Sequence, residues 1–91
     1  MNIITVTSQN GDHPAHQTLV SEKAKKAVRI GFNPSALPRV DRLKALAAAF
    51  ITECENGQNE MPHAGREFAV AITEMQKASM FAVLAATTDA A

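Results

Sequence analysis

The segment from Ala78 to Ala86 limits most strongly what this chain can fold into, because it is apolar almost all round. A helix with apolar side chains on every side has to be buried on every side. The chain has only 91 residues and one cysteine, so it has neither a large core nor a disulfide to support one. We therefore expect other copies of the chain to cover part of this segment in a homo-oligomer. The alternative is a three-helix monomer that covers the segment with its own N-terminal arm.

Helical periodicity predicts two long helices joined by a short loop. The first is expected to begin near Leu37, with Pro38 in its first turn, and to end at Asn56-Gly57. The second is expected from about residue 64 to residue 87, and two helices connected in this way pack antiparallel. The apolar stripes that predict the hairpin comprise Val40, Leu43, Ala47, Phe50, Ile51 and Cys54 on the first helix and Phe68, Ile72, Met75, Ser79 and Ala82 on the second.

The residues before the hairpin predict a short helix preceded by an arm. Apolar residues keep helical spacing from about Thr18 to Ile30, and Gly31 provides a stop. Residues 1–15 hold mostly polar and turn-forming residues after one short β-prone stretch, so we expect an arm there. The predicted fold class is all-α: an antiparallel helical hairpin with a short N-terminal helix, assembled into a homo-oligomer. The arm would occupy residues 1–15 and the hairpin domain residues 16–91.

The sequence contains no pattern that predicts catalysis or a metal site. His13 and His16 are three residues apart, but they flank a proline in a stretch that is expected to be a surface loop. Cys54 belongs to the apolar stripe, so we interpret it as a small core residue rather than a nucleophile. Solvation explains the carboxylates near the hairpin tip, which are Glu53, Glu55 and Glu60. We expect no catalytic residue, no metal and no cofactor, and hence no enzyme.

The N-terminal residues lack the charged start and long apolar run of a secretory signal. No apolar run is longer than Ala45–Ile51, which is about a third of the length that spans a membrane. A single unpaired cysteine fits a reducing compartment. We therefore expect a cytoplasmic protein with no membrane partner.

Basic residues gather in one part of a chain whose net charge is zero. Residues 23–44, the basic belt, carry seven lysines and arginines against Asp41 alone. Such asymmetry favours an anionic partner, although a solvated face balanced by acids on neighbouring helices explains it equally well. At the centre of the belt, the turn Phe32-Asn33-Pro34-Ser35 combines an aromatic ring, polar groups and a helix N-terminus.

These groups are the parts of a nucleotide pocket. An aromatic ring can stack on a base, and cations and a helix N-terminus can bind phosphate. In the other interpretation, Phe32 packs into the hairpin core and Lys44 is an ordinary exposed lysine. The candidate ligand-binding residues of this region are Lys26, Arg29, Phe32, Asn33, Ser35, Arg39 and Lys44.

Two stretches of the sequence resemble a known family of small phage proteins. The first is Gly31-Phe32-Asn33-Pro34-Ser35 followed by Val40–Ala48, and the second is Arg66–Val83. They are similar to the helical-hairpin domain shared by phage anti-CBASS cyclic-nucleotide sponges and the related anti-Thoeris sponges, over roughly residues 29–87. The resemblance implies a compact oligomer, a hexamer in known members, that sequesters a cyclic oligonucleotide immune messenger in the host cytoplasm.

The resemblance also implies roles for particular residues. Family members stack a tyrosine on the base and contact phosphate with a lysine of the first hairpin helix. Lys44 matches that lysine, and Phe32 is the aromatic residue nearest to the tyrosine position, without its hydroxyl group. Some relatives bind cyclic trinucleotides in a second pocket, for which Arg66 and Thr73 match the motif. Leu84 replaces a lysine of that pocket and cannot bind phosphate.

The competing hypothesis is a phage helical adaptor that binds DNA or a host protein through the basic belt. Zero net charge and the lack of flexible basic tails disfavour non-specific binding to duplex nucleic acid. The expected partners are therefore a cyclic dinucleotide or trinucleotide and other copies of the chain, with no duplex nucleic acid. The sequence does not indicate which bases the ligand carries.

Overall fold

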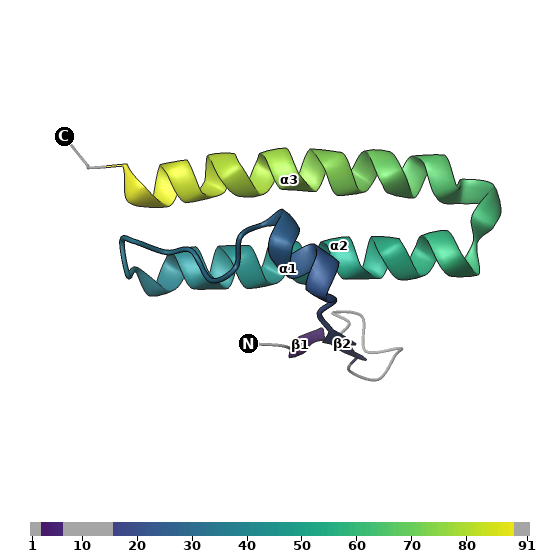
Figure 1. Ribbon diagram of the computed structural model, residues 1–91, viewed down its shortest axis with the longest axis horizontal. Coiled ribbons are helices and arrows are strands. Elements are labelled where there is room, and N and C mark those ends of the chain that lie inside the picture. Colours follow the sequence, from purple (N-terminus) through teal and green to yellow (C-terminus); the bar gives the residue numbers. More distant parts are fainter. Residues whose placement is uncertain (1–2, 7–15, 89–91) are drawn as a thin grey trace.

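Two long antiparallel helices dominate the computed structural model, which describes residues 3–6 and 16–88 (Figure 1). Helix α2 covers Pro38–Glu60 and helix α3 covers Gly65–Thr87, with the short 3-10 helix η1 (Pro62–Ala64) between them. Leu37 is the N-cap of α2 and Pro38 its first residue, where the missing N–H of proline costs no hydrogen bond. The predicted helical hairpin is confirmed.

The predicted end of the first hairpin helix is wrong, because α2 continues past Asn56-Gly57 to Glu60. Gly57 is buried inside the helix, and a Cβ atom at this position would lie 2.5 Å from Cζ of Phe68. The glycine therefore allows the Phe68 ring of α3 to pack directly on the backbone of α2. A residue type that often ends helices serves here to bring two helices together.

The N-terminal region contains a small sheet, so the fold is not purely α-helical. Strand β1 (Ile3–Val6) pairs antiparallel with strand β2 (His16–Leu19), with Ile3 opposite Leu19. The sheet lies on the opposite side of α2 from α3 (Figure 1). The helix predicted from Thr18 instead begins at Glu22, as α1 (Glu22–Ala27). The rest of the predicted arm, residues 1–2 and 7–15, lies outside the described residues.

The side chains of β2 and the N-cap of α1 explain the corrected boundary. Thr18 is buried between exposed neighbours, which is the period-two pattern of a strand. Ser21 caps α1, since its Oγ accepts a hydrogen bond from the Ala24 N–H at 3.0 Å. His16, predicted in a surface loop, lies in the strand, and its Nε2 is 2.9 Å from Oε2 of Glu53.

Two of the carboxylates interpreted as solvated hold the N-terminal region on α2 instead. Oε2 of Glu53 accepts a hydrogen bond from Oγ1 of Thr18 at 2.7 Å. Oε1 of Glu55 accepts one from Oγ of Ser21 at 2.7 Å. Glu60 is exposed, as expected. Hydrogen bonds between distant parts of the chain therefore fix the sheet and α1 against the C-terminal half of α2.

Helix α1 ends earlier than the predicted stop at Gly31. Its C-cap is Val28, and Arg29 follows in the left-handed region with φ of 54°. The Arg29 N–H donates to the Lys26 carbonyl at 3.1 Å, and the Ile30 N–H donates to the Lys25 carbonyl at 3.0 Å. This is the Schellman pattern, in which glycine usually takes the left-handed position. Arginine occupies it here, two residues before the glycine.

The core lies mainly between α1 and α2. Small side chains on α2 allow close packing, and α3 contributes Ile72 and Met75, which are only partly buried. Phe50 was predicted on the buried stripe but is largely exposed. The residues of the central cluster are Val20, Ala24, Val28, Ala47, Ala48, Ala49 and Ile51.

A face of α3 stays uncovered in the single chain. Phe81 is 68% exposed and Leu84 60% exposed, and Met80 and, further toward the start of α3, Val70 are exposed as well. The open surface predicted from the segment Ala78–Ala86 is therefore present and has no partner within the described residues. By length and composition alone, the segment Pro62–Thr87 also meets the requirement for a membrane span. Core helices of soluble proteins pass the same test, so this is weak evidence for a membrane.

Candidate functional site

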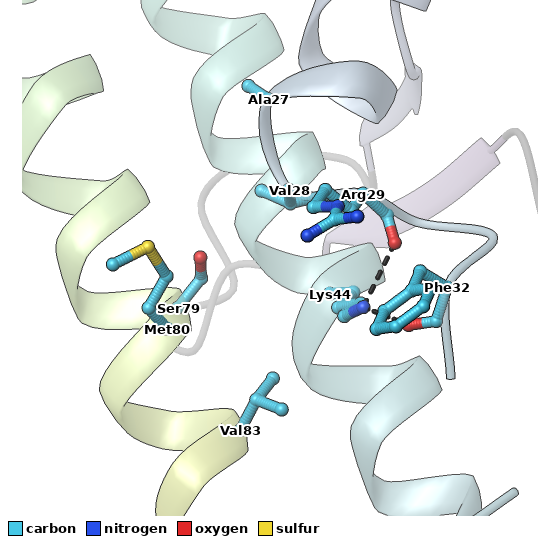
Figure 2. A pocket seen from close by; sticks show the side chains of 8 residues that line it. All are labelled: Ala27, Val28, Arg29, Phe32, Lys44, Ser79, Met80 and Val83. Carbon is cyan, nitrogen blue, oxygen red and sulfur yellow. Dashed lines mark hydrogen bonds between the residues drawn. The ribbon is translucent and has the colours of Figure 1, made fainter. Parts of the chain in front are cut away.

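Two neighbouring cavities lie where the turn after α1 meets α2 and the end of α3. The first, the Arg29 cavity, has a volume of about 210 Å³ (Figure 2). Its lining residues are Ala27, Val28, Arg29, Phe32, Lys44, Ser79, Met80 and Val83. The second, the Asn33 cavity, has a volume of about 300 Å³. Its lining residues are Phe32, Asn33, Pro34, Ser35, Val40, Lys44, Val83 and Thr87. Phe32, Lys44 and Val83 belong to both cavities.

Lys44 is a buried cation at the centre of this site. Its Nζ donates hydrogen bonds to the carbonyls of Arg29, at 2.9 Å, and of Phe32 (dashed lines in Figure 2). Burial lowers the pKa of Lys44, the nearby Arg29 lowers it further, and Asp41 opposes the change. An ammonium group has three N–H donors, so two are used by these carbonyls and the third has no partner among the described residues.

The Phe32 ring lies beside two cations. The Arg29 guanidinium is 4.6 Å from the ring centroid and the Lys44 Nζ is 5.5 Å from it. The Phe32 N–H donates to the Arg29 carbonyl at 2.9 Å, which closes a tight turn. Phe32 is 54% exposed, so the alternative in which it packs into the hairpin core is wrong for the single chain. An exposed ring with cations around it can stack on the face of a base.

Asn33 and Ser35 line the Asn33 cavity and also hold the loop before α2. Nδ2 of Asn33 donates to the Leu37 carbonyl and to Oδ1 of Asp41, both at 3.0 Å. Oγ of Ser35 donates to Oδ1 of Asn33 at 2.6 Å. Most of the hydrogen-bonding capacity of these two side chains is therefore used within the loop, which gives the cavity a preformed polar wall.

The other predicted site residues do not reach either cavity. Lys26 and Arg39 are exposed near the site but line neither cavity. Arg66 lies in the first turn of α3, at the opposite end of the hairpin (Figure 1). Thr73 is exposed further along α3, and its Oγ1 donates to the Ala69 carbonyl at 3.2 Å. The structure thus brings together Arg29, Phe32, Asn33, Ser35 and Lys44 only.

Sequence reasoning missed the contribution of α3 to the site. Ser79, Met80, Val83 and Thr87 complete the walls of the two cavities. Met80 and Val83 belong to the segment Ala78–Ala86, for which the sequence predicts contacts with other subunits. Their position beside Lys44 follows from the antiparallel alignment of α3 along α2, for which the sequence has no direct signal.

Cys54 and the acidic residues have no catalytic arrangement in the part of the chain that the structure describes. Burial raises the pKa of the Cys54 thiol, and the neighbouring Glu53 and Glu55 raise it further. A raised pKa disfavours the thiolate, which is the reactive form. Among the described residues, no group of three or more histidine, cysteine, aspartate or glutamate side chains could hold a metal ion.

A comparison with known protein families identifies the part of the chain that contains the hairpin and both cavities. Neither the curated proteins nor the solved structures give a match to the chain. A family model described as the Acb2/Tad1 hairpin domain matches residues 22–87. The matched range begins at the first residue of α1 and ends at the last residue of α3, so it includes every residue that lines the two cavities. The chain belongs to the Acb2/Tad1 hairpin-domain family, which is the family of the anti-CBASS and anti-Thoeris sponges.

Proposed function

We propose that this protein binds a cyclic oligonucleotide immune messenger, a cyclic dinucleotide in the first instance, and sequesters it without altering it. In the host cytoplasm this would block a CBASS-type defence. The observation that carries the proposal is the pair formed by Phe32 and Lys44, an exposed aromatic ring beside a buried cation at the junction of two cavities. Membership of the sponge family supports it.

The chemistry of the pair suits a cyclic dinucleotide. The free N–H donor of Lys44 would bind a phosphate oxygen, and a charge-assisted bond of this kind contributes about 1.5–3 kcal/mol. The Phe32 ring would stack on a base, which contributes about 1–3 kcal/mol. A cyclic dinucleotide consists of two nucleotides, each with a phosphate and a base. The two adjoining cavities offer room for one nucleotide each.

The residues around the cavities favour binding over cleavage. Among the described residues, those that line them include no histidine and no carboxylate that could act as a general base. Ser35 is hydrogen-bonded to the Asn33 amide, which cannot take its proton. The chemical groups present are those that hold an anion and a base.

In the proposed complex, a second copy of the chain covers the open face of α3 beside the ligand. Met80 lines the Arg29 cavity and also belongs to the uncovered apolar face of α3 with Phe81 and Leu84. A subunit that covers this face would therefore close over the ligand as well. Exposed apolar surface of this kind is typical of subunit contacts. We propose a homo-oligomer, a hexamer by resemblance to known sponges.

Isothermal titration calorimetry with a panel of cyclic dinucleotides and trinucleotides tests the function. We expect tight binding of one or a few members of the panel, and recovery of the intact ligand by chromatography after heat denaturation. Recovery of linear nucleotide would show catalysis and contradict the proposal. Absence of binding to the panel, together with salt-sensitive binding to any DNA duplex, would instead support an adaptor that uses the exposed cations of the basic belt.

A further inference from the structure

Arg29 has an unfavourable backbone conformation for its residue type. Its φ of 54° is in the left-handed region, where glycine has no steric penalty and a side chain with a Cβ atom has one. The Schellman hydrogen bonds at the end of α1 would form equally well with glycine at this position. Ala36 also has a positive φ, of 58°, so the backbone alone does not assign a role to Arg29, and the surroundings of its side chain decide the question.

That side chain lies near another cation, Lys44, and neither of the two forms a salt bridge within the described residues. Among the described residues, no carboxylate lies within salt-bridge distance of the Arg29 guanidinium or of the Lys44 ammonium. Asp41 favours the charged form of Lys44, but its Oδ1 accepts a hydrogen bond from Asn33. The guanidinium is held beside Phe32 by a contact with the ring, which does not neutralise it.

Both cations line the Arg29 cavity, whose remaining wall is largely apolar (Figure 2). Lys44 is buried and Arg29 is exposed, so solvent weakens the repulsion between the two like charges, and an anion bound between them would remove the rest. Arginine has several N–H donors in one plane, and this arrangement matches the oxygens of a phosphate.

We propose that Arg29 and Lys44 hold the same phosphate group of the ligand, and that Arg29 keeps its strained backbone in order to supply this second cation. The guanidinium would leave its contact with Phe32 when the ligand enters, which frees the ring for a base. The inference rests on the proposed function and deepens it, because it assigns the Arg29 cavity to a phosphate and makes Arg29 a ligand-binding residue.

The test uses three variants of the full chain, with stability and affinity measured on each. Arg29→Gly removes the side chain and relieves the backbone, Arg29→Gln removes only the charge, and Lys23→Gln removes an exposed charge of α1 that lines neither cavity. We expect both Arg29 variants to weaken binding of the cyclic nucleotide by about ten- to a hundredfold. The melting temperature of Arg29→Gly should rise, and Lys23→Gln should behave as wild type. Unchanged affinity in Arg29→Gln would overturn the proposal.

A second measurement separates this inference from the proposed function. Inorganic phosphate is titrated into the wild type and into Arg29→Gln while the Lys44 side-chain resonances are followed by NMR. If no cyclic nucleotide binds the wild type, the sponge function fails. A phosphate-dependent shift at Lys44 that disappears in Arg29→Gln would then still support the shared anion site. No shift in the wild type, or the same shift in both proteins, would contradict it.

Discussion

Helices α2 and α3 have the same length of 23 residues and run side by side, yet α2 is far more buried than α3 in the single chain. In α2, ten residues are buried, because α1 and the sheet pack on one side of it and α3 on the other. In α3 only Ser79 is buried, although α3 is the more apolar helix. A helix whose apolar side chains exceed what its own chain covers is built for further contacts. We propose that a second subunit covers this face of α3, and that α3 also forms one wall of the ligand site.

The largest expected effect comes from placing a charge on the open face of α3. Replacing Phe81 or Leu84 by Asp should prevent assembly, because a buried unpaired charge costs several kcal/mol. Light scattering should show oligomers for the wild type and monomers for the two variants, with helical circular dichroism retained. Lys77→Asp reverses the charge at an exposed position of the same helix and breaks only a surface ion pair with Glu74, so it should leave assembly intact. A wild type that is monomeric at micromolar concentration would contradict the proposal that the open face of α3 forms contacts between subunits.

Truncation in α2 should affect the folded chain itself rather than its assembly. Ile51 is 1% exposed in the central cluster, so Ile51→Ala should destabilise the protein by about 2–5 kcal/mol. Met80→Ala on α3 provides the matched comparison, because it removes a similar side chain from an exposed position. Chemical denaturation measured at the same protein concentration should show a much larger loss for Ile51→Ala. Equal losses would mean that assembly contributes as much to stability as the core does.

Substitutions of Lys44 and Phe32 should affect ligand affinity and folding stability to different extents. Lys44→Ala should weaken ligand binding about ten- to a hundredfold and also destabilise the turn, because two carbonyls lose their donor. Phe32→Ala should weaken binding by about 1–3 kcal/mol, with little change in stability, because the ring is exposed. Melting temperature and affinity, measured on both variants, distinguish the two effects. Unchanged affinity in Lys44→Ala would exclude the site.

The smallest effect concerns the contact between the two helices. Gly57→Ala inserts a methyl group into the Phe68 ring, and overpacking of this kind costs about 1–3 kcal/mol. Alanine is favoured over glycine within a helix by about 0.5–1 kcal/mol, so a modest net loss of stability is expected. Gly57→Ala combined with Phe68→Leu should recover part of the loss, which thermal denaturation can measure. A Gly57→Ala variant more stable than the wild type would show that the ring moves aside without cost.

Local signals in the sequence predicted the parts of the fold that depend on neighbouring residues. The apolar stripes and Pro38 predicted the two hairpin helices, and Ala78–Ala86 predicted a surface that one chain leaves open. Residue chemistry alone pointed to the turn at Phe32 and to Lys44 as binding candidates. The family resemblance suggested the hairpin domain, which the family model shows.

Only the tertiary structure decided the features that depend on residues distant in the chain. The β1–β2 pairing and the hydrogen bonds of Glu53 and Glu55 join segments far apart in sequence, so no local pattern predicts them. Gly57 looked like a helix stop until Phe68 of the other helix was placed against it. Lys44 became a buried cation because the turn after α1 folds back and supplies two carbonyls. Periodicity determines which face of a helix is apolar, but the path of the rest of the chain determines what covers that face.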